Sequence, residues 1–236
     1  PTFYADFKGM HAGKSDYKST TRDVRQLLNE LNEQEVQGII IDLRDNGGGS
    51  LQEANSLTGL FIGLGPTVQV RNASGHVEII RDHDPGLVYS GPLVVLVNRM
   101  SASASEIVAG ALQDHKRAII MGSQSFGKAS VQTVVPLGNG SALKLTTARY
   151  YTPNGTSIQA KGIVPDIILD DVKVSKAEDN GFDRTKEKDL SRHLKNGDAE
   201  KKSKNKKGAK DTKDKLVLAK DDYALYEALN LLKGLD

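Results

Sequence analysis

The sequence predicts an α/β fold with a mainly parallel β-sheet flanked by helices. A strand–loop–helix unit occurs twice in the first half of the chain, and a third apolar, strand-like run follows it. Strands that alternate with helices are typical of parallel sheets, because each helix returns the chain to the edge where the next strand starts. At 236 residues, 38% of them hydrophobic, the chain can form one such domain and an appendage.

The first unit is preceded by residues 20–31, whose apolar spacing and leading threonines predict a capped amphipathic helix. After Gly38, the β-branched run 39–43 is typical of a buried strand. Three consecutive glycines, residues 47–49, separate that strand from a helix predicted over 51–61. The unit therefore reads strand, glycine loop, helix.

The second unit repeats this order, with a strand at 93–97 and a helical apolar face from 104 to 112. Residues 118–122 predict a third buried strand. Beyond it, residues 131–150 form two alternating segments around a glycine-rich turn, which predicts a hairpin. We expect 162–167 to be an edge or closing element, because Pro165 cannot donate to a central ladder.

Three regions are predicted along the chain: a core over 1–174, a disordered linker over 175–220 and a C-terminal amphipathic helix over 221–236. The linker is polar and almost without apolar residues, so burial cannot offset the entropy of ordering it. Eight of the fifteen residues 201–215 are lysine, so the net charge of +2 reflects a local cluster and says little about partners.

Composition excludes several classes of protein. With no cysteine, the chain has no disulfide framework, thiolate nucleophile or Cys-ligated metal. No apolar run of 18 residues exists, so we expect no integral membrane span. Because Pro1 leads at once into a strand-like segment, residues 2–7, we expect a natural N-terminal part to be missing.

The second strand-to-helix junction carries three serines, Ser101, Ser103 and Ser105, where helix N–H groups and the helix dipole favour a developing oxyanion. Ser103 and Glu106 also have the spacing of a capping box, so a purely structural role is an alternative. A nucleophilic serine needs a base. The nearest histidine, His115, lies twelve residues further along the same helix, about 18 Å away at ~1.5 Å per residue.

Lysine can be the base where burial lowers its pKa from about 10.4. Lys128 is the best placed, because residues 125–132 surround it with small and apolar neighbours after a buried strand. A surface lysine beside a turn is the structural alternative. The sequence pattern alone leaves both possibilities open.

Three separated motifs, residues 41–49, 101–107 and 126–128, together resemble the C-terminal processing, or tail-specific, proteases. The match covers about residues 1–170, and the interval of 25 residues from Ser103 to Lys128 fits the nucleophile-to-base spacing of that family. The resemblance selects Ser103 over its neighbouring serines. It also implies a Clp-protease/crotonase-like core, and a role for Gln132 in orienting the lysine amine.

The resemblance implies a serine endopeptidase that cleaves proteins near apolar C-termini through an acyl-enzyme, without a cofactor or metal. The N–H of Ala104, and that of Gly49 or Gly48, would bind the oxyanion. We expect Arg44 and Asp45 to brace the glycine loop by pairing, or to form a plain surface salt bridge. Asp114 is interpreted as structural.

Family members usually carry an upstream PDZ domain, which is not present here, so an upstream PDZ domain or adaptor is a possible partner. The resemblance favours a periplasmic or inner-membrane-associated location over a plastid lumen. Two other function classes are a non-catalytic relative that binds protein or lipophilic ligands and a crotonase-like acyl-CoA enzyme. We interpret the lysine-rich segment as a solvated linker that binds no nucleic acid, since it lacks stacking aromatics.

Overall fold

The computed structural model describes residues 2–14, 16–170, 172, 174–175 and 217–235. The chain divides into two units, 1–170 with 227–236 and 171–226, and the first contains both sheets and the candidate site. The predicted linker, 175–220, lies almost entirely outside the described residues. The domain boundaries at 174 and 220 therefore stay a prediction.

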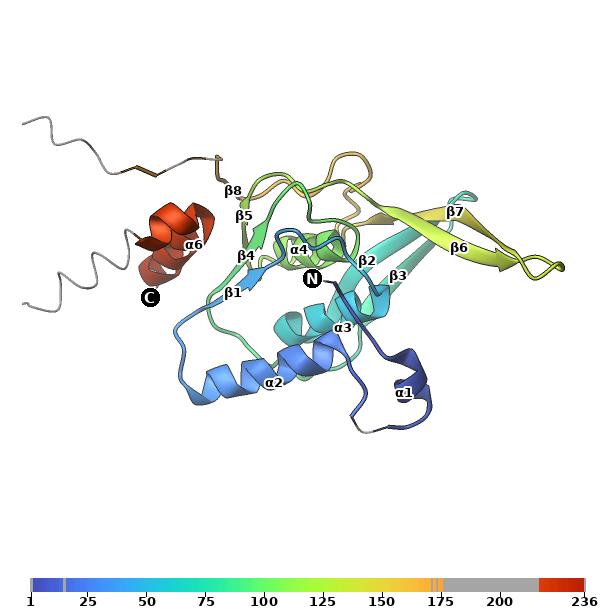
Figure 1. Ribbon diagram of the computed structural model, residues 1–236, viewed down its shortest axis with the longest axis horizontal. Helices are drawn as coiled ribbons and strands as arrows, with labels where there is room; N and C mark the ends of the chain where they lie inside the picture. Colours follow the sequence, from blue (N-terminus) through green and yellow to red (C-terminus); the bar gives the residue numbers. More distant parts are fainter. Residues whose placement is uncertain (1, 15, 171, 173, 176–216, 236) are drawn as a thin grey trace, which may run out of the picture. The chain divides into compact units, whose positions relative to one another are not determined.

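The first sheet is parallel and confirms the predicted α/β class (Figure 1). Its order is β1-β4-β5-β8, with Ile39 opposite Leu93 and Val97 opposite Gly122. All residues of β4 are buried, as expected for a central strand covered on both faces. The strands are β1 (Ile39–Asp42), β4 (Leu93–Val97), β5 (Ile119–Gly122) and β8 (Ile167–Ile168).

The second sheet is antiparallel, in the order β3-β2-β7-β6. Its predicted hairpin is confirmed as β6 (Ser130–Pro136) paired with β7 (Ala142–Tyr151). The other two strands, β2 (Gly65–Asn72) and β3 (Val77–Asp82), were not predicted. They pair with each other and join the hairpin through β2 and β7.

Helix α4 (Ala104–Asp114) contacts β5 of the parallel sheet and β2 of the antiparallel sheet, and it packs on α3 (Leu51–Ile62). Residues 104–112 are all buried, as expected for a helix enclosed on every side. The remaining helices are α1 (Phe7–His11), α2 (Thr20–Glu33) and α6 (Tyr223–Gly234). None of the helices in the described part is long and apolar enough to cross a membrane.

Two local predictions near the N-terminus were wrong. Residues 2–7 make only isolated bridges, Phe3 with Gly49 and Ala5 with Ser19, before α1 begins. The cap of α2 is Ser19 and not a threonine, since its hydroxyl accepts the N–H of Arg22 at 3.3 Å.

Asp82, at the end of β3, supplies a test of stability. It is buried against Gly59 of α3, Oδ2 has no hydrogen-bond partner in the described chain, and desolvation raises the pKa of its carboxyl. Because the pKa of Asp82 is higher in the folded state than in the unfolded state, ionisation of this carboxyl destabilises the fold at pH values above the ordinary pKa of aspartate. Asp82→Asn should therefore raise Tm at pH 7 by about 2–4 °C, the effect of ~1 kcal/mol in a domain of this size. Thermal unfolding followed by circular dichroism should show that the Tm difference between the variant and the unmodified protein becomes smaller towards pH 4. A lower Tm for the variant at pH 7 would contradict this account.

Candidate active site

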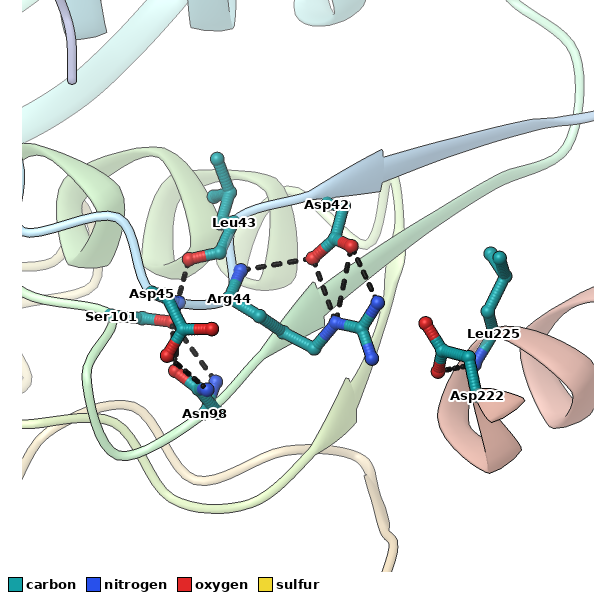
Figure 2. A network of polar contacts seen from close by, with 8 residues as sticks. All are labelled: Asp42, Leu43, Arg44, Asp45, Asn98, Ser101, Asp222 and Leu225. Carbon is teal, nitrogen blue, oxygen red and sulfur yellow. Dashed lines mark hydrogen bonds and ion pairs between the residues drawn. The ribbon is translucent and has the colours of Figure 1, made fainter. Parts of the chain in front are cut away.

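The loops that follow β1 and β4 lie side by side, because these strands are parallel neighbours whose carboxyl ends share one edge. Figure 2 shows a reciprocal pair joining them: Asp45 N–H donates to Asn98 Oδ1, and Asn98 Nδ2 donates to Asp45 Oδ1, both at 3.0 Å. The expected pairing of Arg44 with Asp45 stays a prediction. Arg44 forms an ion pair with Asp42 at 2.6 Å, because that carboxylate lies two residues back along the extended chain.

Two of the three serines at the second junction have structural hydroxyls. Ser101 is fully buried and its Oγ donates to the carbonyl oxygen of Leu43 at 2.8 Å (Figure 2). Ser105 is also fully buried and donates to the carbonyl oxygen of Asn46 at 2.8 Å. Both serines therefore attach the start of α4 to the loop after β1.

Ser103 differs from both in exposure and backbone conformation. It is partly exposed, and its φ of 57° with ψ of −113° is a conformation that non-glycine residues rarely adopt. Such strain is characteristic of a nucleophile held on a sharp strand-to-helix turn. Ser103 and Glu106 form the capping box that their spacing predicts, and the N–H of Glu106 also donates to the main-chain oxygen of Ser103 at 2.9 Å.

Glu106 is a fully buried carboxylate that connects Ser103 to the loop carrying Lys128. Its Oε2 accepts the N–H of Ser103 at 2.8 Å and that of Lys128 at 2.9 Å. Its Oε1 accepts the Ser125 hydroxyl and the Gly127 N–H, each at 2.6 Å. Four donors around one carboxylate compensate for its burial without a cationic partner.

This carboxylate brings the main chains of the two predicted catalytic residues together. Because the N–H groups of Ser103 and Lys128 donate to the same oxygen, their nitrogens lie less than ~6 Å apart. The Lys128 side chain, however, is exposed, and it makes no hydrogen bond or ion pair with any described residue. The expectation of a buried lysine is not met, and the neighbouring Phe126 is also 61% exposed.

Gln132 lies on β6, opposite Thr146, next to an irregularity in the register after Val131. Its side chain is exposed and forms no hydrogen bond with Lys128 among the described side chains. The strand places it near the lysine loop, four residues further along the chain. The contact implied by the resemblance is absent from this part of the structure.

The three predicted main-chain donors differ in whether their N–H groups already have an acceptor. Within the described residues, no acceptor binds the N–H of Ala104 or that of Gly49, whereas the Gly48 N–H donates to Asn46 Oδ1 at 3.0 Å. Ala104 is the first residue of α4, where the helix dipole adds partial positive charge. Of the two predicted loop donors, Gly49 is thus the one with a free N–H.

The remaining titratable candidates have structural partners. His115 lies at the far end of α4, with Nε2 2.7 Å from the carbonyl oxygen of Pro66. Asp114 Oδ2 accepts the N–H of Asn154 at 2.7 Å. The residues described here contain no group of three His, Cys, Asp or Glu side chains that could hold a metal ion.

Comparison with known families identifies this arrangement. A model described as Peptidase family S41 matches residues 4–169, which include both loops, α4 and the hairpin. The chain belongs to peptidase family S41. The predicted resemblance to C-terminal processing proteases is thereby confirmed.

Individual S41 proteins are similar to this chain over much of its length. It is 43% identical over 93% of its residues to the carboxy-terminal-processing protease of Bartonella bacilliformis, and it covers 49% of that protein. It is 45% identical over 65% of its residues to the tail-specific protease of Haemophilus influenzae, and it covers 23% of that protein. A solved photosystem II D1 C-terminal processing protease matches 72% of this chain with a TM-score of 0.63 and 38% identity; 40% of that chain is covered. The chain thus spans half or less of the length of these relatives.

The S41 fold gives structural roles to three residues that the sequence did not identify as parts of the site. Asn46 and Asn98 hold the glycine loop, and Glu106 holds the lysine loop. Glu106 was interpreted only as a possible cap partner. The signal available in the sequence was a carboxylate inside residues 104–112, a run that is otherwise apolar or small.

Gly48 provides a sharp test of this S41 site. A Cβ there would lie 2.8 Å from Ser103 Cβ and 2.9 Å from Ala104 N, and φ is +100°. Gly48→Ala should therefore displace Ser103 and, if Ser103 is the predicted nucleophile, reduce peptide hydrolysis by about 100-fold or more. Gly47→Ala is the matched control, because nothing lies within 4 Å of its Cβ position. Similar steady-state rates for the two variants would contradict the predicted packing.

Proposed function

We propose that this chain is the catalytic domain of a serine endopeptidase that cleaves protein substrates near their C-termini, with Ser103 as nucleophile and Lys128 as base. One observation carries the proposal. The main-chain N–H groups of a strained, partly exposed serine and of a lysine share one buried carboxylate oxygen, that of Glu106. A lysine side chain is long enough to reach a hydroxyl from that separation.

In the proposed reaction, Ser103 Oγ attacks the peptide carbonyl while the free amine of Lys128 takes the hydroxyl proton. The C–N bond of the resulting tetrahedral intermediate breaks, and the lysine ammonium passes the proton to the leaving amine. A water molecule, deprotonated by the same lysine, then attacks the acyl-enzyme ester. Collapse of this second intermediate returns the proton to Ser103 and releases the carboxyl product.

The oxyanion of each intermediate would be bound by the N–H groups of Ala104 and Gly49. Both donors are free of other acceptors within the described chain, so they need not break an existing hydrogen bond to act. Donors of this kind typically contribute about 3–4 kcal/mol each to the transition state. Gly48 then has a steric role, keeping the loop close to Ser103.

Because the Lys128 side chain is exposed, the proposed mechanism requires bound substrate to shield it from water. Lysine acts as a base only as the free amine, and removal of water favours that form. A peptide lying across the partly exposed Ser103 would cover Lys128 and exclude water from it. Gln132, on the strand that leaves the lysine loop, is our candidate for orienting the amine in that complex.

The substrate class and setting of this domain are also proposals. The similar proteins are named for carboxy-terminal processing and tail-specific proteolysis, which supports protein substrates, with apolar C-termini as our expectation. An upstream PDZ domain or adaptor would supply additional recognition. We propose a periplasmic or inner-membrane-associated location.

An acyl-CoA enzyme and a non-catalytic binding protein are the competing functions. The decisive assay compares hydrolysis of a peptide with an apolar C-terminus against turnover of a CoA thioester, with mass spectrometry of the products. We expect cleavage of the peptide bond and no thioester turnover. Thioester turnover without peptide cleavage would support the acyl-CoA function, and turnover of neither would support the binding protein.

Glu106→Gln should lower kcat by about 10–100-fold with little change in KM. An amide replaces one acceptor oxygen by an NH₂ group, which faces N–H donors and separates the Ser103 and Lys128 loops. Glu53→Gln is the matched control, because Glu53 is also buried and accepts the Ser19 hydroxyl and the Thr21 N–H, both at 2.8 Å. A positioning role for Glu106 predicts that both variants lose stability but only Glu106→Gln shows the large loss of kcat. Equal kcat losses at equal loss of stability would refute it.

A further inference from the structure

Two arginines oppose each other directly on the antiparallel sheet, outside the residues used in the proposed mechanism. Arg71 of β2 is the register partner of Arg149 of β7, so their side chains leave the same face of the sheet. No carboxylate among the described residues forms an ion pair with either guanidinium. Like charges directly opposite each other are unfavourable, unless an anion lies between them.

The Arg71 guanidinium is held in place before any ligand binds. It lies over the ring of Tyr151, 4.0 Å from the centroid, and its Nη2 donates to Gln69 Oε1 at 2.8 Å. Gln69 is itself fixed, because its Nε2 donates to the carbonyl oxygen of Pro153 at 2.7 Å. Of the five N–H donors of Arg71, only this one has an acceptor in the described chain, and Nε is enclosed without a partner.

Arg71 and Arg149 both line a hollow of about 390 Å³. Arg149 is exposed, and two threonines line the same hollow; the hydroxyl of one, Thr147, is hydrogen-bonded to that of Thr133 at 2.8 Å. The hollow lies where β2 ends and β7 continues into the hairpin. Its lining consists of Arg71, Asn72, Thr146, Thr147, Arg149 and Tyr151, with two alanines.

The register of the sheet places this hollow near the lysine loop. On its other side, Arg149 is the partner of Ser130, and Tyr150 N–H donates to the carbonyl oxygen of Ala129 at 2.7 Å. Ser130 follows Lys128 by two residues, a span of about 7 Å in an extended chain. A peptide held at the proposed active site can therefore extend over the arginines with only a few residues.

We infer that Arg71 and Arg149 form a subsite that binds a carboxylate of the peptide substrate. The inference rests on the proposed function, because a peptide cleaved near its C-terminus carries an α-carboxylate a few residues beyond the scissile bond. Planar guanidinium groups match a carboxylate in geometry and charge, and the pair would relieve its own repulsion on binding. The catalytic core would thus recognise the free end of a substrate directly.

The subsite can be tested by binding alone, with the Ser103→Ala variant as a non-hydrolysing background. Fluorescence anisotropy would compare one labelled apolar peptide as free acid and as C-terminal amide. We expect the free acid to bind about tenfold more tightly, and the preference to disappear on Arg149→Gln. Arg149 is exposed, so its replacement leaves core packing intact, and Arg71→Gln should have the same effect. Arg81→Gln, on exposed β3 of the same sheet, is the control that should keep the preference.

A third peptide, an amide with aspartate as its last residue, separates the two sources of carboxylate. Tight binding would show that a side-chain carboxylate suffices, and weak binding would assign the subsite to the α-carboxylate. Equal affinity for free acid and amide, or a preference that survives both arginine variants, would overturn the inference. If the active protein hydrolysed the free acid and the C-terminal amide at equal kcat/KM, the inference would also be overturned, while the proposed function would stand. Binding with the predicted preference but no hydrolysis would contradict the proposed function alone.

Discussion

Ser103→Ala should reduce peptide hydrolysis by at least about 10³-fold and leave the fold intact. Ser103 is partly exposed, and the Glu106 N–H keeps the main-chain oxygen of Ser103 as an acceptor. Loss of the capping hydroxyl should therefore cost no more than about 0.5–2 kcal/mol of stability. Removing the attacking oxygen leaves only transition-state binding by the remaining donors, which is a small part of covalent catalysis. Release of new peptide termini, quantified by mass spectrometry, measures the loss.

Ser105→Ala is the matched control for that experiment. Its hydroxyl is fully buried and donates to the carbonyl oxygen of Asn46, so the variant leaves a buried acceptor without its partner. We expect it to unfold at lower temperature by an amount equivalent to about 1–3 kcal/mol, with less than tenfold loss of activity. The opposite pattern, an active Ser103→Ala and an inactive, stable Ser105→Ala, would assign the nucleophile to Ser105.

Lys128→Ala should abolish hydrolysis to a similar extent, because Glu106, the carboxylate beside Ser103, already accepts four hydrogen bonds from other groups. The Lys128 side chain is exposed and makes no contact that stabilises the fold, so Tm should change little. Lys128→Arg should be equally inactive, since a guanidinium keeps its proton at any working pH.

Lys144→Ala is the control for the lysine variants. Lys144 is exposed on β7, in the same hairpin region, and has no role in the proposed reaction. Its rate should equal that of the unmodified protein. Residual hydrolysis by Lys128→Ala above about a tenth of the normal rate would show that another group accepts the proton.

Much of the parallel sheet was predictable because its strands are short and rich in β-branched residues, and because β4 is buried along its whole length. The run 39–43 and the run 93–97 are apolar at every or nearly every position, and the burial of β4 explains why. Strands β2 and β3 were missed because their burial is mixed and Gly65 and Pro66 open the first of them. Sequence periodicity does not distinguish such strands from polar loops.

The candidate site shows the same limit at the level of single residues. The resemblance selected Ser103, but the backbone strain that distinguishes it from Ser101 and Ser105 is visible only in three dimensions. Glu106 was hidden because its four partners come from two loops that are far apart in sequence. Lys128 was expected to be buried from its apolar neighbours, yet local composition cannot report which side chains a turn directs outward.

The most direct test of the central claim is to trap the acyl-enzyme. The protein would be mixed with an activated ester of an apolar peptide, quenched in acid within milliseconds to seconds, and digested for mass spectrometry. The proposed mechanism predicts one acyl group on Ser103, absent from Ser103→Ala and strongly reduced in Lys128→Ala. An acyl group on another residue, or full acylation of Ser103 without Lys128, would contradict the pairing of this serine with this lysine.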